Sequence, residues 1–473
     1  MASAMRAMAD GGTGTQGIER TVDEWRAEAE ALEAADRLDE AEAILAQIIE
    51  AKPYYPPALI QAAILAYKRK QTALATERLE RVVGLVPDDA TYRRNLCEIY
   101  RTASRLDDAL AQALHALDLE PANAASFYNL AVLHYDRLET DQAIAYARRT
   151  LELEPDMAGA HFELAENLLL TGRFAEGWEE YEWRFRLAEA PPLLPPHDRP
   201  QWDGKPMPDG VLMLIGDQGF GDTIQFCRYI PEVAKLCPNI LVACSPEMEP
   251  IIMQQPGVAR YFSRWEEMPA FDAFCPLSGL PRLFGANLDN IHAPVPYLRA
   301  DPTRSERWRR RLEALTPKGY RRVGLVWAGR PTHGNDFNRS TSLHNLAPLG
   351  QLERVALISL QMGDGKSQIG GYYGAAPLIN LGPEIEDYDD TMAVLDNLDH
   401  LVTVDTSVAH LAGAMGRPVS ILLPFAPDWR WLLERRDTPW YPSIELFRQP
   451  RPGSWAEPIQ AVAERLKAKP GRK

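Results

Sequence analysis

The sequence has few cysteines, no basic stretch and no long apolar run. Its five cysteines are scattered and form no CxxC pair, which argues against a disulfide framework or a zinc knuckle. A protein that grips nucleic acid through phosphates needs clustered Lys and Arg, and the chain has no such cluster and a formal net charge of −15. No window of about 18 apolar residues occurs, so no membrane span is expected. We therefore expect a protein of the reducing cytoplasm that binds no nucleic acid.

The first 20 residues lack the compact apolar core of a secretory signal, and we interpret residues 1–20 as a flexible tail. The chain has 473 residues, of which 46% are hydrophobic and 25% charged. This composition is that of a folded globular protein, and the length is too great for one ordinary core. Two or three domains are expected.

A 34-residue repeat organises the N-terminal part of the chain. A proline recurs at this spacing, and small residues stand 12 and 24 positions before each proline. The positions are Pro53, Pro87, Pro121 and Pro155, with Ala41, Ala75, Ala109 and Ala143, and with Ala29, Ala63, Cys97 and Ala131. Small residues let two helices approach closely, and a proline cannot continue the second helix. The pattern resembles the tetratricopeptide repeat and predicts an α-solenoid over residues 21–189 with about four and a half repeats.

The fifth repeat is irregular. It keeps Ala165, but its second small position is Gly177 and its proline is displaced to Pro191. Degenerate terminal repeats usually cap a solenoid. We expect the aromatic segment Trp178–Phe185 to pack against the next domain.

The composition changes after a proline-rich linker, predicted at 190–210. Short apolar runs, partly β-branched, follow with helical patterns between several of them: Val211–Ile215, Asn239–Val242, Arg322–Trp327, Val355–Gln361, His400–Val404 and Val419–Leu423. Strands that alternate with helices imply a parallel sheet with crossover helices. A second proline-containing stretch divides this half. The predicted parts are one α/β lobe at 211–300, an interlobe segment at 301–320, a second lobe at 321–450, and a C-terminal helix and tail at 451–473.

A glycine-rich stretch, LIGDQGFGDTIQF, follows the first expected strand and opens an expected helix. Its glycines, Gly219 and Gly221 among them, allow a tight turn and close approach of a ligand to the backbone. In open parallel sheets, ligands bind at the carboxyl ends of the strands. The spacing is neither the Rossmann fingerprint nor a P-loop with its lysine. Asp222 stands at the expected N-cap, where it either caps the helix or acts on a ligand.

A second strand–turn–helix stretch is VDTSVAHLAGAMG. The strand ends at Val404, and Asp405, Thr406 and Ser407 form the turn. Such a turn points free N–H groups and hydroxyls outward, which suits a phosphate. Asp405 can accept hydrogen bonds from a ribose or cap the helix, and His410 on that helix is either structural or a ligand contact.

A polar loop follows another expected strand, which ends near Trp327. The loop carries Arg330, Asn338 and Arg339, and its arginines are candidates for phosphate contacts, although the loop could also be merely solvated. We include Trp327 and Gln361, at the ends of neighbouring expected strands, in the predicted ligand-binding set.

The stretch PFAPDWRWLLERRDTPWYP places aromatic rings, Asp428 and Arg430 directly after a strand. Trp429 and Trp431 form either an aromatic wall, since ring faces stack on bases and sugars, or a packing contact between the two lobes. The pattern leaves both interpretations open.

Together these stretches resemble bacterial tetratricopeptide-repeat glycosyltransferases, whose catalytic half is similar to the heptosyltransferases of glycosyltransferase family 9. The resemblance covers nearly the whole chain after about Thr21. Its most specific pieces are GDQGFGDTIQFCRY, GLVWAG with NRS, VDTSVAHLAGAMGRPV, and PFAPDWRWL followed by PWYP. It implies a two-lobed GT-B fold that holds a nucleotide-sugar mostly with the second lobe.

The resemblance also implies roles for particular residues. Asp222 matches the proposed catalytic base, and Asp405, Thr406 and His410 match a segment that contacts the donor nucleotide. Heptosyltransferases use a lysine near the diphosphate, and Arg339 occupies that neighbourhood here. The implied transfer is direct and inverting and needs no metal, because no acidic DxD pair stands at a suitable strand end. The nucleotide-sugar is a co-substrate, and no permanently bound cofactor is expected.

Three functions remain open. The first is a glycosyltransferase whose protein acceptor, such as a surface or flagellar protein, is recruited to the concave face of the solenoid. The second is a non-catalytic repeat scaffold with a degenerate transferase half. The third is another GT-B-shaped enzyme, such as a nucleotide-sugar epimerase, although the nine histidines show little of the clustering such enzymes tend to need. The sequence leaves the sugar, the nucleotide, the acceptor and the oligomeric state undetermined.

Overall fold

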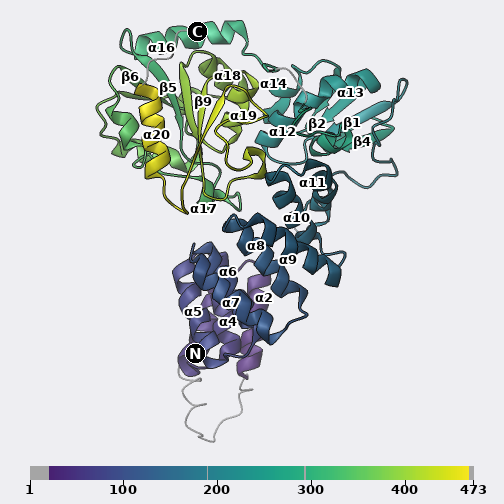
Figure 1. Cartoon of the computed structure of the whole chain (residues 1–473), viewed down its shortest axis with the longest axis vertical. Helices are drawn as coiled ribbons and strands as arrows, with labels where there is room; N and C mark the ends of the chain where they lie inside the picture. The colour runs from purple at the N-terminus through teal and green to yellow at the C-terminus, as the bar shows by residue number, and fades with distance from the viewer. Residues whose placement is uncertain (1–20, 189, 292–294, 468–473) are drawn as a thin grey trace, which may run out of the picture. The chain divides into compact units, whose positions relative to one another are not determined.

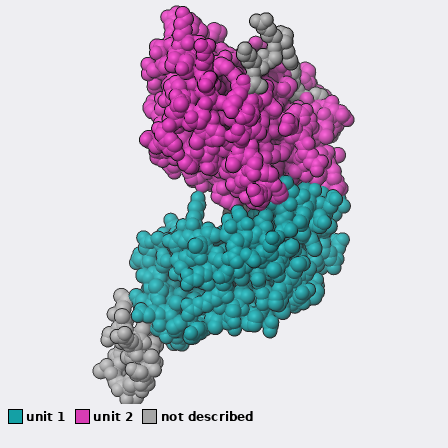
Figure 2. Space-filling view, turned by 60° about the vertical axis from the view of Figure 1, so that its left-hand side comes forward, with its two compact units in different colours: residues 1–163 teal, residues 164–473 magenta. Residues whose placement is uncertain are grey.

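A computed structural model describes residues 21–188, 190–291 and 295–467. The predicted flexible tail, residues 1–20, lies outside these ranges, as does the end of the C-terminal tail. The chain divides into two compact units, residues 1–163 and 164–473, which Figure 2 colours separately. This division falls inside the predicted solenoid at 21–189. The predicted boundaries of the linker and of the lobes remain predictions.

Paired helices build the first unit, as Figure 1 shows. The hairpins are α2 (Val22–Ala34) with α3 (Leu38–Ala51), α4 (Pro56–Lys68) with α5 (Thr72–Leu85), α6 (Ala90–Thr102) with α7 (Leu106–Leu119), and α8 (Ala124–Asp136) with α9 (Thr140–Leu153). A fifth hairpin, α10 (Ala158–Leu170) with α11 (Phe174–Tyr181), spans the division between the units. The predicted helical repeat is therefore present.

The small positions of the repeat are where paired helices meet. Each of these residues has an exposed fraction of at most 1%: Ala29, Ala41, Ala63, Ala75, Cys97, Ala109, Ala131 and Ala143. In the fifth hairpin, a Cβ at Gly177 would lie 2.8 Å from the Leu169 side chain, so only glycine fits there.

The turn inside each hairpin repeats as well. A residue with positive φ ends the first helix in every case, which is a common helix stop. These residues, again 34 apart, are Asp36, Lys70, Ser104, Leu138 and Gly172.

Two parallel sheets form the α/β part of the second unit. The first lobe holds β1 (Val211–Ile215), β2 (Asn239–Ala243), β3 (Val258–Phe262) and β4 (Ala273–Pro276) in the order β3-β2-β1-β4. The second lobe holds β5 (Arg321–Val326), β6 (Val355–Ser359), β7 (Leu378–Asn380), β8 (His400–Val404), β9 (Val419–Leu423) and β10 (Ile444–Arg448) in the order β10-β9-β8-β5-β6-β7. Neighbouring strands pair in parallel in both sheets. The α/β expectation for this half of the chain is confirmed.

The six strands expected from the sequence are present, and the four that it missed are the sheet edges: β3, β4, β7 and β10. Edge strands are covered less completely than central ones and need no continuous apolar run. In β3, for example, Ala259 and Arg260 are exposed.

Helices connect and cover these strands. In the first lobe they are α12 (Phe220–Phe226), α13 (Ile230–Leu236), α14 (Glu249–Ile252) and α15 (Leu280–Leu283). The later ones are α16 (Pro302–Leu315), α17 (Asp336–Arg339), α18 (Tyr388–Asp396), α19 (Ser407–Ala414) and α20 (Ala456–Lys467).

The core of the second lobe draws on the chain's C-terminal part. Ile459 and Val462 of α20 are fully buried in one cluster with Val323 and Leu325 of β5. The predicted C-terminal helix is thus present, and it belongs to the core of this lobe.

Both sheets contain a point where the strand order reverses. The chain leaves β1 toward β2 on one side, and β4 lies on the other side; β5 stands likewise between β6 and β8. Ligands of open α/β sheets bind outside the carboxyl ends of the strands at such points. The loops after β1, β5 and β8, which carry most of the predicted site residues, all begin there. Across the described ranges of the chain, the helices are too short or too polar to cross a bilayer.

Candidate functional site

Asp222 lies in the first turn of α12 and does not cap it. The N-cap is Gly219, whose backbone is extended (φ −67°, ψ 170°), so the helix begins earlier than the sequence predicted. The N-cap interpretation of Asp222 was therefore wrong. The Asp222 carboxylate instead forms an ion pair with the guanidinium of Arg430 through Oδ1.

Arg430 joins the two lobes. Its side chain is buried, its Nη1 lies 3.0 and 2.9 Å from the two carboxylate oxygens of Asp428, and its Nε donates to Gln225 Oε1 at 2.6 Å. Asp222 and Gln225 belong to α12 of the first lobe, whereas Asp428 follows β9 of the second. Sequence reasoning assigned Arg430 no role, because nothing in the local pattern shows which distant carboxylate it meets.

His410 packs directly on the glycine-rich loop. A Cβ at Gly221 would lie 2.9 Å from the His410 ring, which explains the glycine at this position. His410 Nδ1 lies 3.0 Å from the Tyr441 hydroxyl, and its Nε2 lies 3.9 Å from Asp405 Oδ1. Burial, assisted by nearby arginines including Arg430, lowers the pKa of His410 well below its ordinary value. The ring is therefore neutral at physiological pH.

Asp405 is a buried carboxyl beside this histidine. Burial, followed by the charge of Asp428, raises the pKa of Asp405 to about 6. Asp405 does not cap α19; its N-cap is Thr406, whose hydroxyl lies 3.1 Å from that of Thr403. Ser407 Oγ accepts a hydrogen bond from the Tyr388 hydroxyl at 2.9 Å.

Two arginines of the loop after β5 lie near the same carboxyl ends. Arg339 Nε is 3.5 Å from Asp336 Oδ1 and makes no hydrogen bond within the described residues. Arg330 is exposed, and its guanidinium stands 5.1 Å from the centroid of the Phe220 ring of the first lobe. Asn338 Nδ2 donates to the Ala426 carbonyl at 3.2 Å. The loop therefore brings cationic groups to the edge where Asp222 and Asp405 lie.

Gln361 and Trp327 have structural partners. Gln361 Oε1 accepts from the backbone N–H groups of Trp327 and Ala328 at 2.9 Å each, and its Nε2 donates to the carbonyls of Ala328 and Met362. This uses every hydrogen bond that a glutamine amide can make. The Trp327 ring has an exposed fraction of 0% and belongs to the core of the second lobe. Gln361 thus holds the backbone at the start of the loop after β5, and the Trp327 ring packs in the core. The expected contact of both residues with a ligand stays a prediction.

The expected aromatic wall is not at the surface. Trp429 and Trp431 have exposed fractions of 1% and 0%. The Trp429 ring lies 5.2 Å from Trp178 and 5.9 Å from Tyr181, centroid to centroid, and Trp431 lies 5.3 Å from the His410 ring. Buried rings offer no face to a ligand, so both tryptophans pack: Trp429 against α11 of the last hairpin and Trp431 within the second lobe. The alternative that the sequence had left open was packing between the two lobes, which these contacts do not show.

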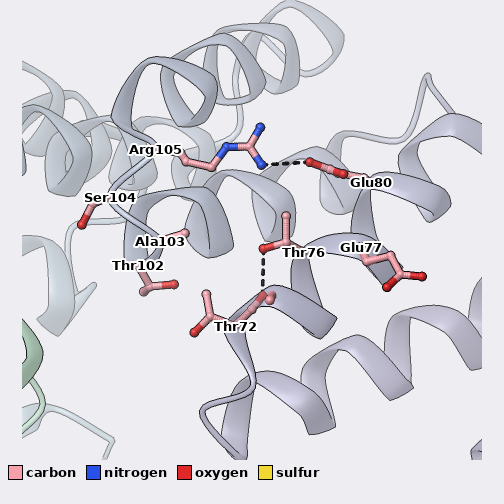
Figure 3. Close-up of a pocket in the computed structure, with 9 residues that line it drawn as sticks. Thr72, Thr76, Glu77, Glu80, Thr102, Ala103, Ser104 and Arg105 are labelled. Carbon is pink, nitrogen blue, oxygen red and sulfur yellow. Dashed lines mark hydrogen bonds and ion pairs between the residues drawn. The ribbon is translucent and has the colours of Figure 1, made fainter.

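The first unit contains a separate surface pocket of about 500 Å³, shown in Figure 3. It lies between the start of α5 and the turn from α6 to α7, and Arg105 Nη1 meets Glu80 Oε1 at 3.0 Å on one side. The lining residues are Thr72, Ala73, Thr76, Glu77, Glu80, Thr102, Ala103, Ser104 and Arg105. Sequence reasoning proposed no function for this pocket.

No group of three or more His, Cys, Asp or Glu side chains is placed to hold a metal ion in the parts of the chain that the structure describes. All five cysteines are free thiols.

Comparison with protein families identifies the class of the N-terminal part. Residues 60–126 and 128–182 match the model of the tetratricopeptide repeat. This part of the chain consists of tetratricopeptide repeats, a class that presents extended surfaces to protein partners.

A curated relative extends the similarity beyond the repeats. Protein FlbA of Caulobacter vibrioides (strain ATCC 19089 / CIP 103742 / CB 15) is 27% identical over 332 residues, which are 63% of this chain and 53% of FlbA. The chain spans about half the length of this relative.

Among solved structures, the chain is similar to MamA (17% identity, 33% of this chain, 92% of MamA, TM-score 0.30). It is also similar to TTC0263, a thermophilic TPR protein of Thermus thermophilus (23% identity, 36% of this chain, 92% of TTC0263, TM-score 0.32).

Proposed function

We propose that this protein is a glycosyltransferase that moves a sugar from a nucleotide-sugar donor to an acceptor. One observation carries the proposal: Asp222 of the first lobe meets Arg430 of the second lobe beside Asp405 and His410, at the carboxyl ends of two parallel sheets. Charged groups gathered at a strand-order reversal are typical of a ligand site. The second lobe, with a GT-B arrangement of the two lobes, would hold the nucleotide-sugar.

In the proposed reaction, Asp222 is the general base. An acceptor hydroxyl attacks the anomeric carbon of the sugar and passes its proton to the carboxylate, while the bond to the nucleoside diphosphate breaks. Arg430 occupies Oδ1, so we assign the proton to Oδ2. A single displacement of this kind inverts the anomeric centre. General-base assistance is typically worth about 10²–10⁴-fold in rate.

The departing diphosphate carries the negative charge that develops. Arg339, whose Nε has no hydrogen-bond acceptor within the described residues, is the group that we assign to it, because an arginine binds phosphate through charge-assisted hydrogen bonds. The turn at Asp405, Thr406 and Ser407 would hold the rest of the nucleotide. The acidic DxD segment at 387–389 lies at the start of α18 (Tyr388–Asp396) and not at the end of a strand, which is in keeping with a transfer that needs no metal.

The acceptor is proposed to be a cytoplasmic protein that the repeats recruit. Residues 1–163 carry 28 Asp and Glu against 17 Lys and Arg, a formal net charge of −11. A surface of this sign favours encounter with basic segments. We therefore expect acceptors with Lys- or Arg-rich stretches near the modified residue.

The first test is a thermal-shift screen with UDP-, GDP-, ADP-, CMP- and dTDP-sugars on the wild type and Asp405→Ala. A ligand that binds the folded state raises the melting temperature by mass action. We expect one nucleotide class to stabilise the wild type and to lose this effect in Asp405→Ala. Absence of any shift at millimolar ligand, with the protein folded, would remove the main support for the enzyme.

A repeat scaffold without turnover is the second candidate. It is favoured by the ion pair that engages Asp222 and by the burial of Trp429 and Trp431. The two candidates predict different results for Asp222→Asn. If the protein is a transferase, the variant loses donor turnover and keeps donor binding. If it is a scaffold, neither the wild type nor the variant turns over the donor.

A further inference from the structure

We infer that the end of the last hairpin and the short 3-10 helix η1 (Glu182–Arg186) after it are part of the site, because Tyr181 and Arg184 are positioning residues for the glycine-rich loop that carries Asp222. The inference rests on the proposed function and adds to it residues that the glycosyltransferase resemblance did not assign. The part of the hairpin used here, from Leu164 onward, belongs to the same compact unit as both lobes.

The first connection runs from Tyr181 through Gln218. The Tyr181 hydroxyl lies 3.0 Å from Gln218 Nε2 and 3.2 Å from its Oε1, so it is within hydrogen-bond distance in either orientation of the amide. In the orientation that satisfies both ends of the amide, the Gln218 nitrogen also donates to Asp222 Oδ1 at 3.1 Å. Tyr181 therefore reaches the proposed base through a single side chain.

The second connection holds Asp217, the other acid of the loop. Its side chain is 1% exposed and accepts hydrogen bonds from the backbone N–H of Ser278, at 3.1 Å, and from the Ser278 hydroxyl. Arg184 donates to the same hydroxyl from Nε at 3.1 Å and lies 3.8 Å from Asp217 Oδ2. Ser278 follows β4, so Arg184 fixes the start of the loop at the strand-order reversal of the first lobe.

Aromatic packing fixes the hairpin itself. Trp178 Nε1 donates to the Ala286 carbonyl of the first lobe at 2.8 Å, and its ring meets Trp429 of the second lobe at a centroid distance of 5.2 Å. Phe174 packs edge-on against Trp440 at 6.4 Å. Because the hairpin is anchored on both lobes, Tyr181 and Arg184 are held in place without needing the loop for support.

The three polar side chains of the loop thus have separate anchors: Asp217 has Ser278 and Arg184, Gln218 has Tyr181, and Asp222 has Arg430. Two of these anchors, Tyr181 and Arg184, come from the end of α11 and from the short helix that follows it. A general base must lie within hydrogen-bond distance of the proton that it takes, and the loop backbone sets that distance. Loss of the Tyr181 hydroxyl or of the Arg184 guanidinium should loosen the loop at Gln218 or Asp217, while Asp222 keeps its ion pair with Arg430.

Amide hydrogen exchange on the full chain tests the connection without any substrate. Tyr181→Phe keeps the ring and removes the hydroxyl, and Arg184→Met removes the guanidinium. We expect several-fold faster exchange in residues 216–222 of both variants. The matched controls are Tyr229→Phe, whose hydroxyl has no hydrogen-bond partner within the described residues, and Arg173→Met, an exposed arginine of the same hairpin that pairs with Glu176. Unchanged exchange in the loop of both variants would overturn the inference.

Steady-state kinetics with the nucleotide-sugar found in the screen tests the consequence. Tyr181→Phe should lower kcat about tenfold, a part of what a general base supplies, while the KM for the donor stays at the wild-type value. A raised KM with unchanged kcat would overturn the positioning role. If the wild type binds no nucleotide-sugar, the proposed function fails, yet faster exchange of residues 216–222 in the two variants would still support the connection between repeat and loop.

Discussion

The two units of this chain hold their charged residues in different ways. In the repeats, ion pairs join side chains about one repeat apart: Lys68 meets Glu33 and Arg101 meets Asp136, each at 2.6 Å. In the second unit, Arg430 meets Asp222, which lies 208 residues earlier in the chain. The repeats have a formal net charge of −11 over residues 1–163, against −4 over residues 164–473.

This difference reflects how each unit is assembled. A repeat packs mainly on its neighbours, so its contacts recur at the spacing of the sequence repeat. The second unit instead brings loops from several strands to one edge, where burial makes each charge dependent on its partner. Disturbing an exposed ion pair of the repeats should therefore cost little, and disturbing the buried Arg430 of the second unit should cost much.

The largest effect is expected from Arg430→Met. It leaves Asp222 and Asp428 without their buried partner, and removal of one member of a buried ion pair costs about 3–5 kcal/mol. The measurement is urea unfolding followed by tryptophan fluorescence, because ten of the 11 tryptophans lie in residues 164–473. A loss below about 1 kcal/mol, the value usual for surface pairs, would remove the contrast between the two units.

The next effect depends on pH. The pKa of Asp405 in the folded protein is about 6, above the value of about 3.9 for an unfolded chain. Between these two values the unfolded chain loses the proton of Asp405 while the folded state keeps it. The free energy of unfolding therefore falls as the pH rises from about 4 to about 6.

Asp405→Asn removes this titration. Its free energy of unfolding relative to the wild type should rise across that window by about 3 kcal/mol and stay constant above it. Urea unfolding at a series of pH values measures the difference. A difference that is the same at all pH values would show that Asp405 is ionised as readily in the folded protein as in the unfolded one.

A substitution at a buried small residue tests how closely the paired helices of the repeats pack. Ala75 is fully buried between paired helices, whereas Ala73, two residues earlier on α5, is exposed. Ala75→Leu should lower stability by about 1–3 kcal/mol, because extra methylenes in a packed interface force neighbours apart. Ala73→Leu is the matched control and should unfold like the wild type. Far-ultraviolet circular dichroism follows the helices and measures the unfolding of both variants. Equal melting temperatures of the two variants would contradict the close approach of the paired helices at Ala75.

The smallest effect is expected at the surface of the repeats. Arg105→Met breaks pairs with Glu80 and Asp108, whose side chains are about half exposed. Exposed pairs contribute about 0.2–1 kcal/mol and are screened by salt, so the loss should shrink further in high salt. A loss as large as that of Arg430→Met would mean that charge placement does not distinguish the two units.

Much of the fold could be predicted because its signals are local. The repeat spacing located the buried small residues of the solenoid, and apolar runs located the central strands. The edge strands were not predicted, because they are partly exposed to solvent and have no continuous apolar run. In the site, the loops after β1, β5 and β8 were recognised from their place behind strands. Trp327 was expected to contact a ligand, and for Trp429 and Trp431 the sequence left a ligand wall and a packing contact open; all three rings are buried. Aromatic residues look the same in a sequence whether they line a surface or fill a core.

The sequence by itself determined the repeat, the central strands, and the loops that carry polar residues, because periodicity and strand ends are properties of neighbouring residues. Only the tertiary structure decided that Arg430 pairs with Asp222, that Gly221 makes room for His410, and that Tyr181 at the end of α11 and Arg184 just after it hold the glycine-rich loop. These contacts join residues far apart in the chain, and which distant groups meet depends on how both sheets and the last hairpin pack together.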